Sequence, residues 1–281
     1  MSLPVFYTPR MVADSRSFSP SAAKPAQVVA RWRERGLAID VHEPAPVTVG
    51  QLCYAHAREF VEGVLAGRLP NGFGNTSRKI AETLTYTSGA MLAAARHARA
   101  HGSNACAPVS GFHHATYRDA NGFCTFNGLM VAACALLRED GATRVGILDY
   151  DMHYGDGTED ILDELDLHDR VAHVTAGALY NCRRDAERLL DELPERVHAM
   201  RGCDVVLYQA GADQHVDDPC GGVLTTEELR ARDEIVFREL SALGIPLAWN
   251  LAGGYQKEAD GGIPKVLEIH TNTALAALAV T

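Results

Sequence analysis

The chain has 281 residues, of which 47% are hydrophobic and 22% are charged, a balance typical of a folded globular protein rather than a membrane-embedded or disordered one. Lys and Arg number 26 against 36 Asp and Glu, so the net charge of −10 argues against nucleic acid as a partner and favours a cationic substrate. Seven scattered cysteines without a C-x-x-C pair predict neither a disulfide framework nor a thiolate zinc site, and the absence of a leader-like or membrane-spanning segment predicts a cytoplasmic protein.

The predicted elements, taken in chain order, alternate between strands and helices. The first half is expected to hold strands near Val5 and Ile39 and over 105–109, with helices over 26–35, 56–66 and 79–101. In the second half we expect strands over 144–149, 170–175, 204–209 and 246–251, with helices over 158–165, 186–200, 226–243 and 264–280. This rhythm predicts one α/β domain over residues 1–281, a central parallel sheet covered by helices on both faces.

Polar side chains that suit a metal follow the predicted strands. Asp151 and His153 are two residues apart, so both side chains lie on the same side of an extended chain. Asp213 follows another strand, and ligands of open parallel sheets collect at the carboxyl ends of the strands. Two carboxylates and an imidazole suit zinc or another divalent first-row ion and leave a coordination position open. Each motif alone would indicate a polar turn, but their coincidence at several strand ends indicates a metal site.

Two adjacent histidines and a tyrosine suggest acid–base chemistry beside that metal. Asp149 and Asp156 flank the predicted ligands, and each can accept the Nδ1 proton of either His113 or His114. The Nε2 atoms would then face water at the metal. Tyr255 follows two glycines, where its hydroxyl can donate to a developing oxyanion.

Four motifs stand in order along the chain: GFHHA at 111–115 with NGFCTFN at 121–127, LDYDMHYGDGT at 148–158, AGADQHVDDP at 210–219, and LAGGY at 251–255. Together they resemble the zinc-dependent histone deacetylase family, which includes bacterial acetylpolyamine amidohydrolases. The resemblance implies the three-layer α/β/α arginase–deacetylase fold around a parallel sheet.

The resemblance also implies roles for individual residues. The zinc ligands, with Fe²⁺ as the alternative metal, would be Asp151, His153 and Asp213. The catalytic set would be His113, His114, Asp149, Asp156 and Tyr255. The tunnel for the acylated amine would be lined by Gly122, Phe123 and Cys220. A structural K⁺ or Na⁺ ion would lie at Asp149, Asp151, His153 and Thr175.

These observations predict a hydrolase of linear amide bonds. We expect a zinc-dependent deacetylase that uses metal-activated water to remove an acyl group from a small acylated amine, a polyamine or an acyl-lysine. The alternative is a non-catalytic metal-binding or interaction protein on the same fold. A dinuclear manganese ureohydrolase would need more ligands than His215 and Asp217, which we expect at the surface or in a loop. Small amines are favoured over a histone-like protein, and homo-oligomerisation stays open.

Two departures from the family pattern concern the surroundings of the site. Tyr154 replaces a second histidine, and we expect it to change the packing beneath the site. A long glycine-rich loop follows the position of Thr175 in many relatives, whereas here a short segment leads into a helix. We therefore expect a rebuilt entrance, with Tyr180 or the loop at 71–75 as candidates for the missing wall.

Overall fold

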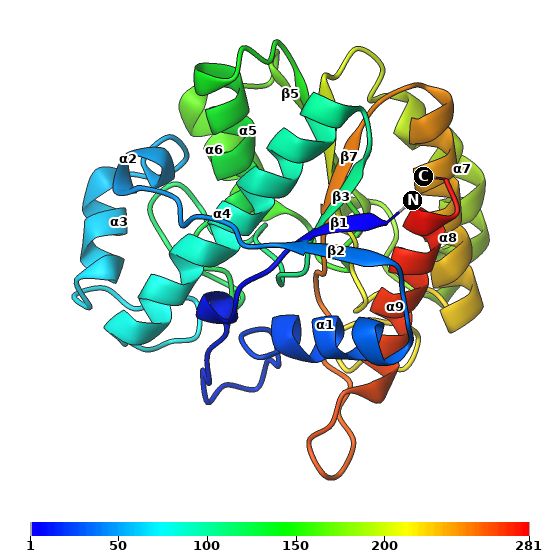
Figure 1. The fold of residues 1–281 in the computed structure, drawn as a ribbon, viewed down its shortest axis with the longest axis horizontal. Coiled ribbons are helices and arrows are strands. Elements are labelled where there is room, and N and C mark those ends of the chain that lie inside the picture. Colours follow the sequence, from blue (N-terminus) through cyan, green and yellow to red (C-terminus); the bar gives the residue numbers. More distant parts are fainter. Residues whose placement is uncertain (1, 281) are drawn as a thin grey trace.

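The computed structural model describes residues 2–280, which form a seven-stranded sheet with every strand parallel to its neighbours (Figure 1). The spatial order of the strands is β2-β1-β3-β7-β6-β4-β5. Their bounds are β1 Leu3–Phe6, β2 Ile39–His42, β3 Asn104–Ala107, β4 Val145–Asp149, β5 Val171–Thr175, β6 Val205–Gln209 and β7 Leu247–Asn250. All the strands expected from the sequence are therefore present.

Helices cover both faces of the sheet. One face carries α2 (Val49–Leu52), α3 (Arg58–Leu65), α4 (Arg78–His101), α5 (Gly128–Glu139) and α6 (Asp156–Leu165). The other carries α1 (Lys24–Glu34), α7 (Ala186–His198), α8 (Thr226–Ala242) and α9 (Pro264–Leu278). Short 3₁₀ helices occur at Pro9–Met11, Ala176–Ala178 and Arg183–Asp185. The predicted three-layer α/β/α architecture is confirmed.

Each face of the sheet has its own buried core. Successive residues of a strand point to opposite faces, so Val205 and Leu207 of β6 join one core and Val206 and Tyr208 join the other. This explains why the strands are almost continuously apolar in sequence. None of the described helices combines the length and the apolar composition needed to cross a membrane.

The helix α5 was not predicted from the sequence. Its residues 128–136 are all buried, so it lacks the alternation of apolar and polar faces that marks a surface helix. Helix α6 begins at Asp156, two residues before the expected start, which places that carboxylate in the first turn of the helix.

The order of the strands determines where the site lies. β3, β7, β6 and β4 are neighbours in the middle of the sheet, and all four are parallel. The segments that follow them are those that carry the four motifs. They therefore meet at one edge of the sheet, at the carboxyl ends of the strands.

Candidate active site

Three side chains converge as a set of metal-binding groups. One ligand atom from each of Asp151, His153 and Asp213 lies within 4.8 Å of the others. Nδ1 of His153 is 3.1 Å from Oδ1 of Asp151 and 3.2 Å from Oδ2 of Asp213. Both carboxylates are buried, whereas the imidazole is 39% exposed. One nitrogen and two carboxylate oxygens thus face a common point that is reachable from outside.

The charges and hydrogen bonds of this set fit a divalent cation. Oδ2 of Asp213 is buried, and its polar neighbour is Nδ1 of His153 at 3.2 Å. Burial next to the Asp151 carboxylate raises the pKa of Asp213. The hydrogen bonds of His153 to Asp151 and Asp213 raise the pKa of His153 to about 11. Two buried carboxylates around one imidazole therefore need positive charge, which a proton or a metal ion can supply.

A buried lysine that the sequence did not single out supports the ligand segment. Nζ of Lys24, in α1, is fully buried and donates to the carbonyl of Gly253 at 2.5 Å. Gly253 has a φ of +54°, and a Cβ at this position would lie 2.2 Å from the Asp213 carboxylate. A side chain here would displace the proposed ligand, which explains the glycine in the LAGGY motif.

Each of the adjacent histidines is paired with a different carboxylate. Nδ1 of His113 lies 2.7 Å from Oδ2 of Asp149, and Nδ1 of His114 lies 2.6 Å from Oδ1 of Asp156. The two ring centres are 4.0 Å apart. Because the carboxylates occupy Nδ1, the Nε2 atoms are the ones left for the cavity.

The two histidines differ in their affinity for a proton. Burial lowers the pKa of His113, but the carboxylates of Asp149 and Asp151 outweigh this effect and raise it to about 9. Burial, followed by the charge of His113, lowers the pKa of His114. The His113 side chain is 3% exposed and that of His114 is 19% exposed. The arrangement therefore combines a buried imidazole of raised pKa with a more accessible imidazole of lowered pKa.

Further buried polar groups hold the first pair in place. Nε2 of Gln209, at the end of β6, donates to Asp149 at 3.2 Å, and its Oε1 accepts from the backbone of Phe112 at 3.2 Å. The backbone N–H of Thr158 donates to the carbonyl of His113 at 3.0 Å. Gln209 thus connects the histidine segment to β4, a contact that no sequence motif indicated.

Most of the remaining site residues line one small cavity. It is lined by Ser21, Ser110, Gly111, His113, His114, Gly122, Phe123, Cys124, Asp151, Gly253 and Tyr255. The Phe123 ring lies 5.9 Å from that of Tyr255. Burial and the nearby carboxylates raise the pKa of Tyr255, so its hydroxyl keeps its proton. Cys220 does not line this cavity, but Asp218 accepts from the backbone N–H groups of both Cys220 and Tyr255.

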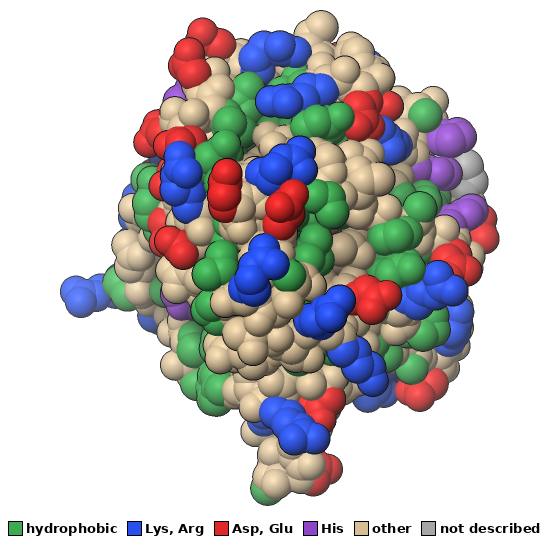
Figure 2. Space-filling view, turned by 90° about the vertical axis from the view of Figure 1, so that its left-hand side faces the viewer, with side chains coloured by type: hydrophobic (Ala, Val, Ile, Leu, Met, Phe, Trp, Pro, Cys, Tyr) green, Lys and Arg blue, Asp and Glu red, His purple; other side chains and the backbone are tan. Residues whose placement is uncertain are grey.

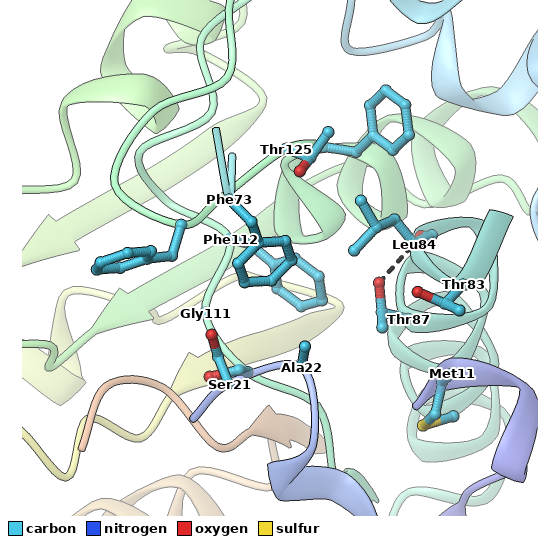
Figure 3. Close-up of a pocket in the computed structure, with 13 residues that line it drawn as sticks. Met11, Ser21, Ala22, Phe73, Thr83, Leu84, Thr87, Gly111, Phe112 and Thr125 are labelled. Atoms are coloured by element: carbon cyan, nitrogen blue, oxygen red, sulfur yellow. Dashed lines mark hydrogen bonds between the residues drawn. The ribbon is translucent and has the colours of Figure 1, made fainter. Parts of the chain in front are cut away.

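A second, more apolar cavity adjoins the first. It shares Ser21, Ser110, Gly111 and Phe123 with its neighbour. Figure 3 shows Phe73 and Phe112 on one side of it and Leu84 with Met11 on the other. The loop at 71–75 therefore reaches this second cavity through Phe73.

Thr175 lies beside the Asp149 end of β4. The two residues are paired across the β4–β5 ladder. Oγ1 of Thr175 accepts from the backbone N–H of Gly155 at 3.0 Å. Two of the residues expected around a monovalent cation, Asp149 and Thr175, are thus neighbours.

Two expectations about the surroundings of the site are wrong. Tyr180 is completely buried and donates to Glu192 at 2.8 Å, so it cannot form a wall of the entrance. Tyr154 is 45% exposed and does not pack beneath the site. His215 lies in a loop as expected, but it is buried, with Nε2 3.0 Å from Oγ1 of Thr226.

Comparisons with known proteins indicate one family. The family model described as "Histone deacetylase domain" matches residues 20–176. An uncharacterized protein of Picosynechococcus is 29% identical over 235 residues, covering 77% of this chain and 74% of that protein. Histone deacetylase 2 of Arabidopsis thaliana is 30% identical over 180 residues, covering 56% and 46% of the two chains. The acetylpolyamine amidohydrolase of Mycoplana ramosa is 29% identical over 223 residues, covering 69% and 60%.

Solved structures share the fold over the whole chain. The HD domain of HDA15 matches with a TM-score of 0.79 at 20% identity, covering 100% of this chain and 91% of the other. An acetylpolyamine aminohydrolase from Burkholderia pseudomallei matches with a TM-score of 0.77 at 18% identity, covering 99% of both chains. The fold is the arginase–deacetylase fold, and the family model covers more than half of the sequence. The chain belongs to the histone deacetylase family and is a hydrolase of amide bonds.

Proposed function

We propose that this protein is a zinc-dependent deacetylase that removes the acetyl group from a small acylated amine, and that residues 1–281 form its single catalytic domain. The observation that carries the proposal is one cavity lined by a residue of the metal-binding set, by both carboxylate-paired histidines and by a tyrosine. Its relatives include enzymes named for acetylpolyamines and for histones.

Asp151, His153 and Asp213 would hold the metal, for which zinc suits the donor set and Fe²⁺ is the alternative. A divalent ion at this position supplies Lewis acidity to the acyl carbonyl and to the attacking water. Asp149, Asp151, His153 and Thr175 would bind K⁺ or Na⁺ as a structural ion.

His114 is the residue that moves protons in this proposal. Its Nδ1 is held by Asp156, and its ring lines the cavity and is partly exposed. Nε2 would take a proton from the attacking water and return it to the leaving amine. His113, buried against Asp149, would remain charged and stabilise negative charge that develops on the substrate.

Tyr255 would donate its hydroxyl proton in a hydrogen bond to the oxyanion of the tetrahedral intermediate. Its raised pKa keeps it a donor, and Asp218 fixes its backbone at 2.7 Å. Gly122 and Phe123 would line the path of the amine chain, with Cys220 close to its wall.

The surface charge does not discriminate between small amines and basic peptides as substrates. The face in Figure 2 carries Lys and Arg side by side with Asp and Glu, with no broad region of one sign. The net charge of −10 attracts cationic amines and basic peptides alike. Our preference for a small substrate therefore depends on the short segment after Thr175, which contributes no wall for a long peptide.

Turnover of a panel of acylated amines tests the proposal. For the zinc-loaded protein, kcat/KM for acetate release should be higher with an acetylated diamine than with an acetyl-lysine peptide at equal ionic strength. His114→Ala is the matched variant, which should keep its metal and lose acetate release. A clear preference for the peptide would overturn the small-substrate part. If the metal-loaded protein released acetate from none of the acylated amines in the panel, the deacetylase assignment would be overturned.

A further inference from the structure

A phenylalanine from the N-terminal segment lies exposed at the catalytic tyrosine position. Phe18 is 56% exposed, more than the other large hydrophobic side chains exposed in the described part of the chain. Its ring stacks on that of Tyr255, with centres 6.0 Å apart and planes 14° from parallel. An apolar ring that is neither buried nor distant from the site requires an explanation, since an exposed phenylalanine gains little free energy in the folded protein.

A lysine two residues beyond Tyr255 holds this ring in place. Nζ of Lys257 donates to the carbonyl of Phe18 at 2.5 Å and lies 5.5 Å from the centre of the Phe18 ring. No carboxylate lies within ion-pair distance of Lys257 among residues 2–280. The ammonium group is thus used for a contact between two segments 239 positions apart in sequence.

The two aromatic neighbours of Tyr255 come from opposite parts of the chain. Phe123 contacts Tyr255 from the segment after β3, and Phe18 contacts it from the segment before α1. The segment between β7 and α9, which contains Tyr255 and Lys257, projects from the body of the molecule as the orange-red loop in Figure 1. Phe18 therefore lies at the contact between this loop and the N-terminal segment, against Tyr255, which lines the cavity.

From these contacts we propose that Phe18 forms the aromatic wall of the substrate entrance and packs against the alkyl chain of the acylated amine. This inference rests on the proposed function and specifies which residue replaces the wall that the short segment after Thr175 lacks. Lys257 acts as a positioning residue that keeps the wall next to Tyr255. Tyr180 is excluded from this role by its burial.

The wall makes binding depend on the length of the alkyl chain. Each methylene that leaves water and packs fully adds about a fourfold gain in affinity, and one-sided contact adds about twofold. Loss of a ring that contacts two or three methylenes on one side should therefore weaken binding of a six-carbon chain by about fourfold to eightfold and leave a one-carbon chain unaffected.

The test measures binding without turnover. The zinc-loaded Tyr255→Phe protein lacks the phenol hydroxyl but keeps the ring on which Phe18 stacks. In this background, dissociation constants of N-acetyl-methylamine, N-acetyl-propylamine and N-acetyl-hexylamine would be measured by NMR titration, with and without Phe18→Ala. Leu275→Ala is the matched control, since Leu275 is also a large exposed apolar side chain (48%) but lies on α9 and not in a segment whose ring contacts Tyr255.

The expected result is affinity that rises with chain length in the Tyr255→Phe parent and in the Leu275→Ala control, and rises less steeply in Phe18→Ala. Lys257→Met, which removes the ammonium and keeps an alkyl chain, should reduce the length dependence in the same direction. If the affinity of Phe18→Ala rose equally with chain length, the role proposed for Phe18 would be overturned and the deacetylase assignment would remain intact. No binding of any amide, in any variant, would overturn the proposed function and the wall with it.

Discussion

The substitution Gly122→Ala adds one methyl group next to the His114 ring and so tests whether the position of that ring matters for activity. Gly122 has a φ of +52°, and a Cβ there would lie 2.4 Å from Cδ2 of the His114 ring. Carbon atoms in contact are about 3.5–4.0 Å apart, so Gly122→Ala must move the ring by about 1 Å. A misplacement of about 1 Å in a catalytic group costs about 100-fold in rate. We expect kcat/KM for acetate release to fall on that scale.

The control separates the contact from the backbone strain. Gly36 has a φ of +68°, and a Cβ there would meet nothing within 4 Å. Both alanine variants should lose about 1–2 kcal/mol of stability in urea unfolding, because both place an L-residue in the left-handed region. Only Gly122→Ala should lose activity, with its metal content unchanged. Equal activity in the two variants would refute the role given to the His114 ring.

Three further predictions address the metal, the oxyanion and a buried histidine. Asp213→Ala should lose the bound metal, about one equivalent per chain in the parent protein, and full occupancy by elemental analysis would show that the ligand assignment is wrong. Tyr255→Phe should lower turnover about 100- to 1,000-fold with metal binding intact, and unchanged turnover would remove the tyrosine from the mechanism. Burial lowers the pKa of His56 to about 4, and its Nδ1 donates to the carbonyl of Thr116 while its Nε2 accepts from the N–H of Asn127, so it must stay neutral. In the unfolded chain the His56 imidazole binds a proton below about pH 6.5. Its contribution to the free energy of unfolding should therefore be complete above that pH and about 2.5 kcal/mol smaller at about pH 4.5. An equally steep loss of stability with falling pH in His56→Gln, measured by urea unfolding, would contradict this.

The fold was largely predictable because its strands are short apolar runs bounded by polar turns. Each such run corresponds to a strand in the structure. The helix α5 escaped prediction because burial on every side removes the periodicity on which a helix prediction depends. The start of α6 was placed two residues late, since helix ends are set by local hydrogen bonds rather than by pattern.

The residues of the candidate site likewise fall into those that the sequence predicted and those that it did not. The ligand-type residues lie in motifs that follow β3, β4, β6 and β7, and adjacency of these strands brings them together. Lys24, Phe18 and Gln209 could not be predicted, because each acts through a contact with a residue 97 or more positions away. A single lysine or phenylalanine in a loop or helix leaves no pattern in the sequence. Only the folded chain identifies them.

Metal titration of the chelator-treated protein tests the central claim most directly. Bound zinc and acetate released from an acetylated diamine would be measured in the same samples as zinc is added. Acetate release should be absent without metal, rise in proportion to bound zinc and level off at about one equivalent per chain, as one set of three ligands requires. Acetate release that is independent of bound metal, or one equivalent of zinc bound without any release, would contradict the account.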